Sequence, residues 1–367
     1  MRAYLILENG KIFEGEGIGS SRDSIAEVVF NTSMTGYEQV LTDASYAGQA
    51  VCMTYPLIGN YGENPEDMEG KVPNVEGFLV HELSPVASNF RNMGSISDFL
   101  EKYDIPGIQG IDTRALTRII REHGTLNGLI TRKANLDLDQ VKQQLAAYRV
   151  GDVVSKVTCK EVYTKKADPE KAIGLKVALV DLGLKQSIVK SLTKRGVDVT
   201  VYPAGTKAED ILAAKPDGIM LSNGPGDPCD CGEVIKEAKK LFDSGTRIFA
   251  ICLGHQIMAL ANGMETEKMH FGHRGGNHPV RDQKTGRVYV TSQNHGYVVK
   301  ADAVDKNIAE PSFVNVNDGT IEGLAYKNRP VLTVQFHPEA APGPADTGFL
   351  FDRFIEAMKQ DKAALQQ

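Results

Sequence analysis

Three residues stand where they could carry out nucleophilic chemistry. Cys252 lies between an apolar run that ends at Ile251 and a helical pattern, so it would occupy a tight turn between a strand and a helix. Amide groups at the start of a helix favour the thiolate, the reactive form of cysteine. His337 and Glu339 follow a second predicted strand. Because side chains two residues apart in an extended segment point to the same side, Glu339 could orient His337 toward the thiol, which predicts a Cys-His-Glu triad.

A glycine-rich loop at residues 223–228 follows another predicted strand. Gly224 and Gly226 let the backbone approach a ligand closely. We expect the amides of Gly224 and Leu253 to form an oxyanion hole, since the residue after such a nucleophile already directs its amide inward. Taken singly, a cysteine, a histidine before proline and a glycine turn each have a structural role more often than a catalytic one. Their joint occurrence at strand ends favours an enzyme.

The elements that must position these residues begin at Leu175, where apolar strands alternate with helical patterns. This alternation predicts an α/β fold with an open, mostly parallel sheet that binds its ligand at the carboxyl ends of the strands. We predict a catalytic domain over 174–360, a polar linker over 151–173 and a mixed α/β domain over 1–150. In the first domain, the spacing predicts a hairpin around Gly10, a loop at 15–19 and a helix that follows Asp112 or Thr113 and stops at Gly124.

The composition argues against nucleic-acid-binding, membrane-spanning and secreted proteins. The 367 residues carry a net charge of -6 and five cysteines, an odd number. Such a charge gives no basic field for nucleic acid, no apolar run approaches the length of a membrane span, and no secreted disulfide pattern is present. The composition therefore favours a cytoplasmic protein that acts on a small molecule or binds a protein partner.

The motifs resemble those of the class I, triad-type glutamine amidotransferases. Residues 252–256 (Cys-Leu-Gly-His-Gln) and 337–339 (His-Pro-Glu) are shared by that whole superfamily. Over the full chain, the resemblance is to the small, glutamine-hydrolysing subunits of carbamoyl phosphate synthetases. It rests on residues 31–37, 55–60 and 111–114 in the first half, and on 222–228, 271–279 and 293–296 in the second. Ala250 and Tyr297 depart slightly from the family, where glycine and phenylalanine are common.

The resemblance implies a reaction and a partner. Cys252 would attack the side-chain amide of L-glutamine, His337 would move protons, and a thioester would form and be hydrolysed. Ammonia would pass to a large subunit that makes carbamoyl phosphate from bicarbonate. ATP and Mg²⁺ would bind that partner, and no cofactor would bind this chain, which lacks a nucleotide-binding signature. Residues 1–150 would supply much of the docking surface. The residues implied to bind glutamine are Ser45, Gly224, Gly226, Leu253, Gln256, Asn294, Gly296 and Tyr297.

Other interpretations stay open at this point. The chain could feed ammonia to a different synthase, such as one that makes anthranilate or a guanine nucleotide, although the motifs of the first half argue against it. It could be a docking subunit with a vestigial site, against which the intact triad argues. His270, His273 and His278 lie close in sequence, but without a nearby acidic or cysteine ligand set they do not predict a metal site.

Overall fold

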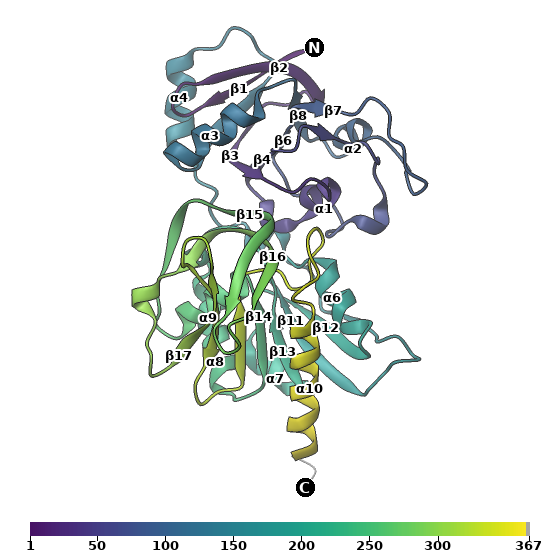
Figure 1. The fold of residues 1–367 in the computed structure, drawn as a ribbon, viewed down its shortest axis with the longest axis vertical. Helices are drawn as coiled ribbons and strands as arrows, with labels where there is room; N and C mark the ends of the chain where they lie inside the picture. The colour runs from purple at the N-terminus through teal and green to yellow at the C-terminus, as the bar shows by residue number, and fades with distance from the viewer. Residues whose placement is uncertain (365–367) are drawn as a thin grey trace. The chain divides into compact units, whose positions relative to one another are not determined.

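The computed structural model describes residues 1–364, and the chain divides into two compact units, one formed by Met1–Gly151 and one that begins at Asp152 (Figure 1). Both units are mixed α/β structures. Among residues 1–364, no helix is long and apolar enough to cross a bilayer.

The first unit contains a closed barrel with the strand order β1-β2-β8-β6-β4-β3-β9. Its strands are β1 (Arg2–Leu7), β2 (Ile12–Gly19), β3 (Ser24–Asn31), β4 (Gln49–Met53), β6 (Gly77–Leu79), β8 (Pro106–Gln109) and β9 (Leu126–Thr131), with β5 (Leu57–Ile58) and β7 (Glu82–Leu83) as a separate pair. Its helices are α1 (Tyr37–Thr42), α2 (Ile96–Lys102), α3 (Thr113–His123) and α4 (Leu138–Ala147), with short 3-10 turns η1 (Ala44–Tyr46) and η2 (Pro65–Asp67). The mixed α/β class predicted for this half is confirmed, whereas closure of the strands into a barrel was not predicted.

Two local expectations have different outcomes. The hairpin is confirmed, since β1 pairs antiparallel with β2 and Gly10 has a φ of 84° in the turn. The loop expected at residues 15–19 is wrong, because these residues lie within β2. A Cβ atom at Gly15 would stand 2.3 Å from the Gln109 carbonyl oxygen, and one at Gly19 2.4 Å from the Ile105 carbonyl oxygen. The glycines therefore mark close approach of neighbouring backbone in the barrel.

Helix α3 begins and ends as its capping residues indicate. The side chain of Asp112 accepts a hydrogen bond from the Ala115 amide at 2.8 Å, and Gly124 ends the helix with a φ of 88°. Leu116 and Ile120 are fully buried on the inner face. Arg114, Arg118 and Arg121 are exposed, as a solvated side of an amphipathic helix should be.

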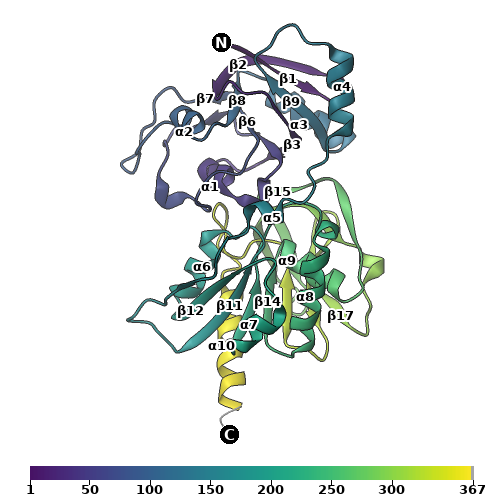
Figure 2. The same cartoon turned by 180° about the vertical axis from the view of Figure 1, so that it is seen from behind.

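The second unit is built on a sheet with the strand order β10-β12-β11-β13-β14-β19-β18-β17-β15-β16 (Figure 2). Strands β12, β11, β13, β14 and β19 are parallel, and the strands beyond them on both sides are antiparallel. The strands are β10 (Tyr163–Lys165), β11 (Leu175–Asp181), β12 (Val197–Pro203), β13 (Gly218–Leu221), β14 (Ile248–Ile251), β15 (Thr266–Asp282), β16 (Val288–Val299), β17 (Ala309–Asn315), β18 (Ile321–Tyr326) and β19 (Val331–Val334). The helices are α5 (Val154–Val157), α6 (Gln186–Thr193), α7 (Ala208–Ala213), α8 (Gly232–Asp243), α9 (Leu253–Ala261) and α10 (Phe349–Ala364), with 3-10 turns η3 (Pro228–Asp230) and η4 (Ala301–Ala303).

Helices cover both faces of the parallel strands, which explains why these strands read as continuous apolar runs. In β11, Ala178 and Val180 pack in a core that includes residues of α7, α8 and α9. Val177 and Leu179 face the opposite core, which includes residues of α6 and α10 (Figures 1 and 2). The predicted open, mostly parallel α/β sheet is confirmed in its centre.

The stretch predicted to be a linker, 151–173, contains two short regular elements of the second unit. It contributes α5 and β10, which pairs antiparallel with β12. The side chain of Asp181, at the end of β11, accepts a hydrogen bond from the Cys159 amide at 2.8 Å. The polar composition of residues 151–173 fits the position of β10 at the edge of the sheet, where polar side chains face solvent.

Candidate active site

Cys252 occupies the sharp turn between β14 and α9. Its φ of 54° and ψ of -109° are strained for a residue with a side chain, a conformation that persists where surrounding contacts impose it. The Cys252 amide donates to the Val334 carbonyl at 2.8 Å. Gly254 lets the helix approach β13, because a Cβ atom there would lie 2.6 Å from the Leu221 carbonyl oxygen. The sequence-predicted elbow is therefore present, with Ala250 fully buried on the strand side.

His337 and Glu339 follow β19, the parallel neighbour of β14, so the sheet brings them to the same edge as Cys252. His337 Nδ1 lies 2.6 Å from Glu339 Oε1, and both side chains are almost fully buried. Nε2 of His337 is buried without a hydrogen bond of ordinary geometry, although Cys252 is close enough to help raise the pKa of the imidazole. Loose contacts of this kind are common in active sites without substrate.

The electrostatics of the pair favour a carboxylate facing an imidazolium. Burial, the largest single effect, would lower the pKa of His337, but the charge of Glu339, the hydrogen bond of Glu339 and the contact with Cys252 together hold that pKa well above its ordinary range. Burial would raise the pKa of Glu339, yet Lys185 and His337 together hold it below its ordinary range. A positioned carboxylate therefore stabilises the protonated histidine, as a nucleophilic triad requires.

The glycine loop lies against the elbow. A Cβ atom at Gly224 would stand 2.7 Å from Leu253 Cδ2 and 2.2 Å from the Leu182 carbonyl oxygen, so only glycine fits between them. Gly226 has a φ of 88°, which glycine adopts without strain. The structure thus brings the two expected oxyanion residues together, and the role of their amides stays a prediction.

Strand β16 carries Asn294, Gly296 and Tyr297, three of the residues expected to bind glutamine. The Cys252 sulfur lies 3.6 Å from the Asn294 carbonyl oxygen. Gln256 on α9 donates its amide hydrogens to the Tyr297 carbonyl at 2.8 Å and to Gln335 Oε1 at 2.9 Å. These bonds fix the orientation of the Gln256 side chain and leave its own oxygen as an acceptor for an ammonium group. Ser45 lies in η1 of the first unit, and its contact with glutamine stays a prediction.

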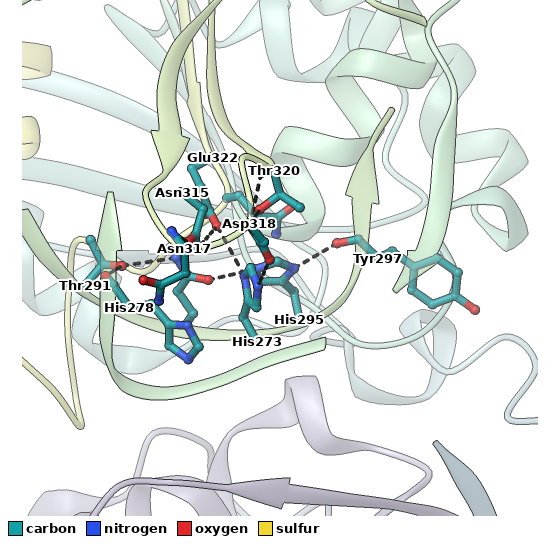
Figure 3. A network of polar contacts seen from close by, with 12 residues as sticks. His273, His278, Thr291, His295, Tyr297, Asn315, Asn317, Asp318, Thr320 and Glu322 are labelled. Carbon is teal, nitrogen blue, oxygen red and sulfur yellow. Dashed lines mark hydrogen bonds and ion pairs between the residues drawn. The ribbon is translucent and has the colours of Figure 1, made fainter. Parts of the chain in front are cut away.

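A cluster of histidines and carboxylates includes His273 on β15, His295 on β16 and Glu322 on β18 (Figure 3). His273 Nε2 is 2.7 Å from Asp318 Oδ2, and its Nδ1 is 3.3 Å from Glu322 Oε1. Burial lowers the pKa of His273, but the two carboxylates raise it to about 9. The expectation that no acidic group accompanies these histidines is wrong, because Asp318 in the β17–β18 turn and Glu322 in β18 come from far along the chain. His270, by contrast, is exposed.

The same cluster includes His295, which lies on the β16 segment next to Cys252. His273, His295 and Glu322 offer ligand atoms within 4.8 Å of one another, a spacing that could hold a metal ion. However, His295 Nδ1 already contacts the Tyr297 carbonyl at 2.8 Å, and its Nε2 contacts Gln293 Oε1 at 3.0 Å. These hydrogen bonds hold the His295 side chain against the part of β16 that presents Asn294 and Tyr297.

Sequence reasoning missed Lys185, whose side chain is 3% exposed. It follows β11 and contacts Glu339 at 3.1 Å. The available signal was a lysine directly after the apolar sequence Leu182-Gly183-Leu184, at the carboxyl end of a parallel strand, where ligands and catalytic groups gather.

Comparison with known proteins gives two family matches that together span most of the chain. Residues 178–357 match the model described as glutamine amidotransferase class-I, and residues 5–130 match that of the carbamoyl-phosphate synthase small chain, CPSase domain. The chain is 50% identical over 356 residues to the carbamoyl phosphate synthase small chain of Clostridium perfringens, covering 97% of this chain and 99% of the relative. It is 49% identical over 360 residues to the pyrimidine-specific small chain of Bacillus subtilis, covering 98% of this chain and 96% of the relative. The Listeria monocytogenes small chain is 48% identical over 358 residues, with 97% of each chain covered.

Proposed function

This chain belongs to the family of carbamoyl phosphate synthase small chains, and we propose that it is the subunit that hydrolyses L-glutamine to glutamate and ammonia for such a synthase. The observation that carries the proposal is the strained Cys252 elbow beside the buried His337–Glu339 pair. Nucleophile, base and orienting carboxylate on adjacent strand ends are the arrangement that acyl transfer through a covalent intermediate needs.

The reaction follows from these positions. The Cys252 thiolate attacks the side-chain carbonyl carbon of glutamine, and the negative charge moves to the carbonyl oxygen. The amides of Gly224 and Leu253 stabilise that oxygen, an interaction worth about 3 kcal/mol per donor in comparable enzymes. His337 then gives its proton to the leaving nitrogen, the carbon–nitrogen bond breaks, and ammonia departs from the thioester. Water, deprotonated by His337, cleaves the thioester to release glutamate and restore the thiolate.

The remaining site residues would hold the other end of glutamine. The Gln256 side-chain oxygen is suited to accept a hydrogen bond from the α-ammonium group. Asn294, Gly296 and Tyr297 lie on the strand that passes Cys252, and we assign them to the α-amino and carboxylate groups. We add Gly226 and, from the first unit, Ser45 to this set.

We further propose that the ammonia passes to a large ATP-using subunit, which binds Mg²⁺ with ATP and combines the ammonia with bicarbonate. In bulk water ammonia is readily protonated and ceases to be a nucleophile, so the two sites must be linked. The first unit is suited to docking, since Val86, Phe90 and Met93 between β7 and α2 are 71%, 96% and 72% exposed. Exposed apolar side chains gathered on one segment mark an interaction surface.

The test is the substitution Cys252→Ser in the full chain, measured with and without the large subunit. We expect glutamine-dependent carbamoyl phosphate synthesis to disappear while synthesis from added ammonium persists. Labelled glutamine should leave a trapped thioester on the wild-type chain and none on the variant. Loss of ammonium-dependent synthesis as well would contradict the assignment. Hydrolysis of glutamine without any complex with an ATP-using chain would favour a different amidotransferase.

A further inference from the structure

We propose that a groove on the second unit, between helix α10 and strands β19 and β18, binds an organic anion with an aromatic body and a carboxylate group. The groove has a volume of about 340 Å³. Arg247, just before β14, and Arg329, just before β19, both line it. The groove therefore lies at the amino ends of the two strands whose carboxyl ends lead to Cys252 and His337. It is a second site, separate from the active site, and the proposal does not depend on glutaminase activity.

The floor of the groove is a row of apolar side chains that crosses the sheet. Phe249 on β14 pairs with Leu332 on β19, which in turn pairs with Ala325 on β18, so these three side chains face the same way. Helix α10 lies against this face, where the rings of Phe249 and Phe354 are 5.6 Å apart (Figure 1). Beyond the helix, Leu332 and Ala325 are only half-buried. Because Ala325 is small, the surface stays low at the place where a larger side chain would fill the space beside α10.

The rim of the groove is cationic, since Arg247, Arg329 and Arg353 line it. Asp361 neutralises Arg247 through two hydrogen bonds, at 2.6 Å and 3.0 Å. Arg353 lies 4.0 Å from Asp282, a looser ion pair. Arg329 is exposed and has no carboxylate partner among residues 1–364. The groove thus combines an apolar floor with one guanidinium whose charge is left for a ligand.

This combination selects the chemical class of the ligand. A guanidinium is a planar fork that binds a carboxylate through two parallel hydrogen bonds. The guanidinium carbon of Arg329 lies 6.0 Å from the centre of the Phe242 ring, a contact that leaves its hydrogen-bond donors available. A flat apolar body would cover Leu332 and Ala325 while its carboxylate reached Arg329. The volume is close to the lower limit of ligand pockets, about 300 Å³, and suits a body of one or two rings.

The test is a calorimetric titration of the full-length chain with naphthalene-2-carboxylate and with naphthalene-2-carboxamide, a neutral molecule of the same shape. We expect the carboxylate to bind at one site per chain and the carboxamide to bind at least about 10-fold more weakly, because it lacks the charge that strengthens hydrogen bonds to arginine. Arg329→Gln should weaken binding of the carboxylate about 10-fold and bring the two affinities together. Ala325→Leu should abolish binding of both molecules, because the longer side chain fills the floor.

The matched control is Arg114→Gln, which removes an exposed arginine from α3 in the first unit and should leave both affinities unchanged. Failure of the wild-type chain to bind the carboxylate, equal affinity for the two molecules, or unchanged binding in Arg329→Gln would overturn the proposal. An affinity that falls as the protein concentration is raised would overturn it as well, because a second copy of the chain would then be covering the groove. Circular dichroism checks that each variant is folded. Should Ala325→Leu fail to fold, Arg329→Gln decides alone, because it alters only an exposed side chain.

Discussion

Gly254→Ala should damage the elbow without removing any catalytic group. The added methyl carbon would lie 2.6 Å from the Leu221 carbonyl oxygen and 2.7 Å from Leu221 Cβ. These neighbours are a backbone atom and the base of a side chain on β13, so they cannot move aside as the end of a long side chain could. Ordinary contact begins at 3.4 Å, and helix α9 must therefore move away from β13 by about 0.8 Å.

This displacement should lower both the stability of the protein and its catalytic rate. Overpacking of this kind destabilises a protein by about 1–3 kcal/mol. A shift near 1 Å at the nucleophile lowers the rate by about 100-fold. The assay pairs urea unfolding with glutaminase kcat, and Gly232→Ala at the start of α8 is the control, because no atom lies within 4 Å of the place that its added methyl carbon would take. Wild-type kcat and stability in Gly254→Ala would refute the reasoning that close approach of helix and strand positions Cys252.

Three further predictions concern charge. His337→Ala should lower glutaminase kcat about 10- to 100-fold more than Glu339→Gln, because the histidine transfers protons and the carboxylate only orients it; equal losses would contradict these roles. The pKa of His273 is raised from 6.5 to about 9. The stability that the protonated histidine contributes is therefore complete below pH 6.5 and is lost as the pH rises through about 9. His273→Gln should flatten the fall of Tm between these two pH values. Burial raises the pKa of Glu38 from 4.5 to about 7, and stability falls as the pH rises through that interval. Glu38→Gln should therefore raise Tm at about pH 8 and have little effect at about pH 4, as differential scanning calorimetry would show.

The sequence was most informative where local chemistry determines the structure. The elbow at Cys252 was predictable because strand, small residues and helix follow one another directly along the chain. Helix α3 was predictable from its caps, Asp112 and Gly124. The contact between His337 and Glu339 was also predicted, although from an extended segment, whereas Pro338 and Glu339 lie in a turn in which the Ala340 amide donates to the His337 carbonyl at 3.1 Å.

The sequence was least informative where distant segments meet. Nothing near Lys185 in the sequence indicates that its ammonium contacts Glu339. The carboxylates beside His273 likewise come from later segments, Asp318 from the β17–β18 turn and Glu322 from β18. The glycine-rich stretch 15–19 was assigned to a loop because it matches no nucleotide-binding motif, although in a barrel glycine also permits close packing of strands. Such contacts depend on the tertiary fold, which no local pattern specifies.

The pairing of β14 with β19 also bears on how the active site forms during folding. Ile248 pairs with Val331, and the antiparallel strands β15 to β18 lie between them in sequence. On a ribosome the nucleophile therefore emerges well before the strand that delivers its base, and the contact between them is strongly non-local, the kind that forms slowly. Until β19 takes its place, the edge of β14 lacks a neighbour and is open to incorrect pairing. Assembly of the triad is thus a late event in synthesis, so that a nascent chain exposes a cysteine without the histidine and glutamate that make it a catalyst.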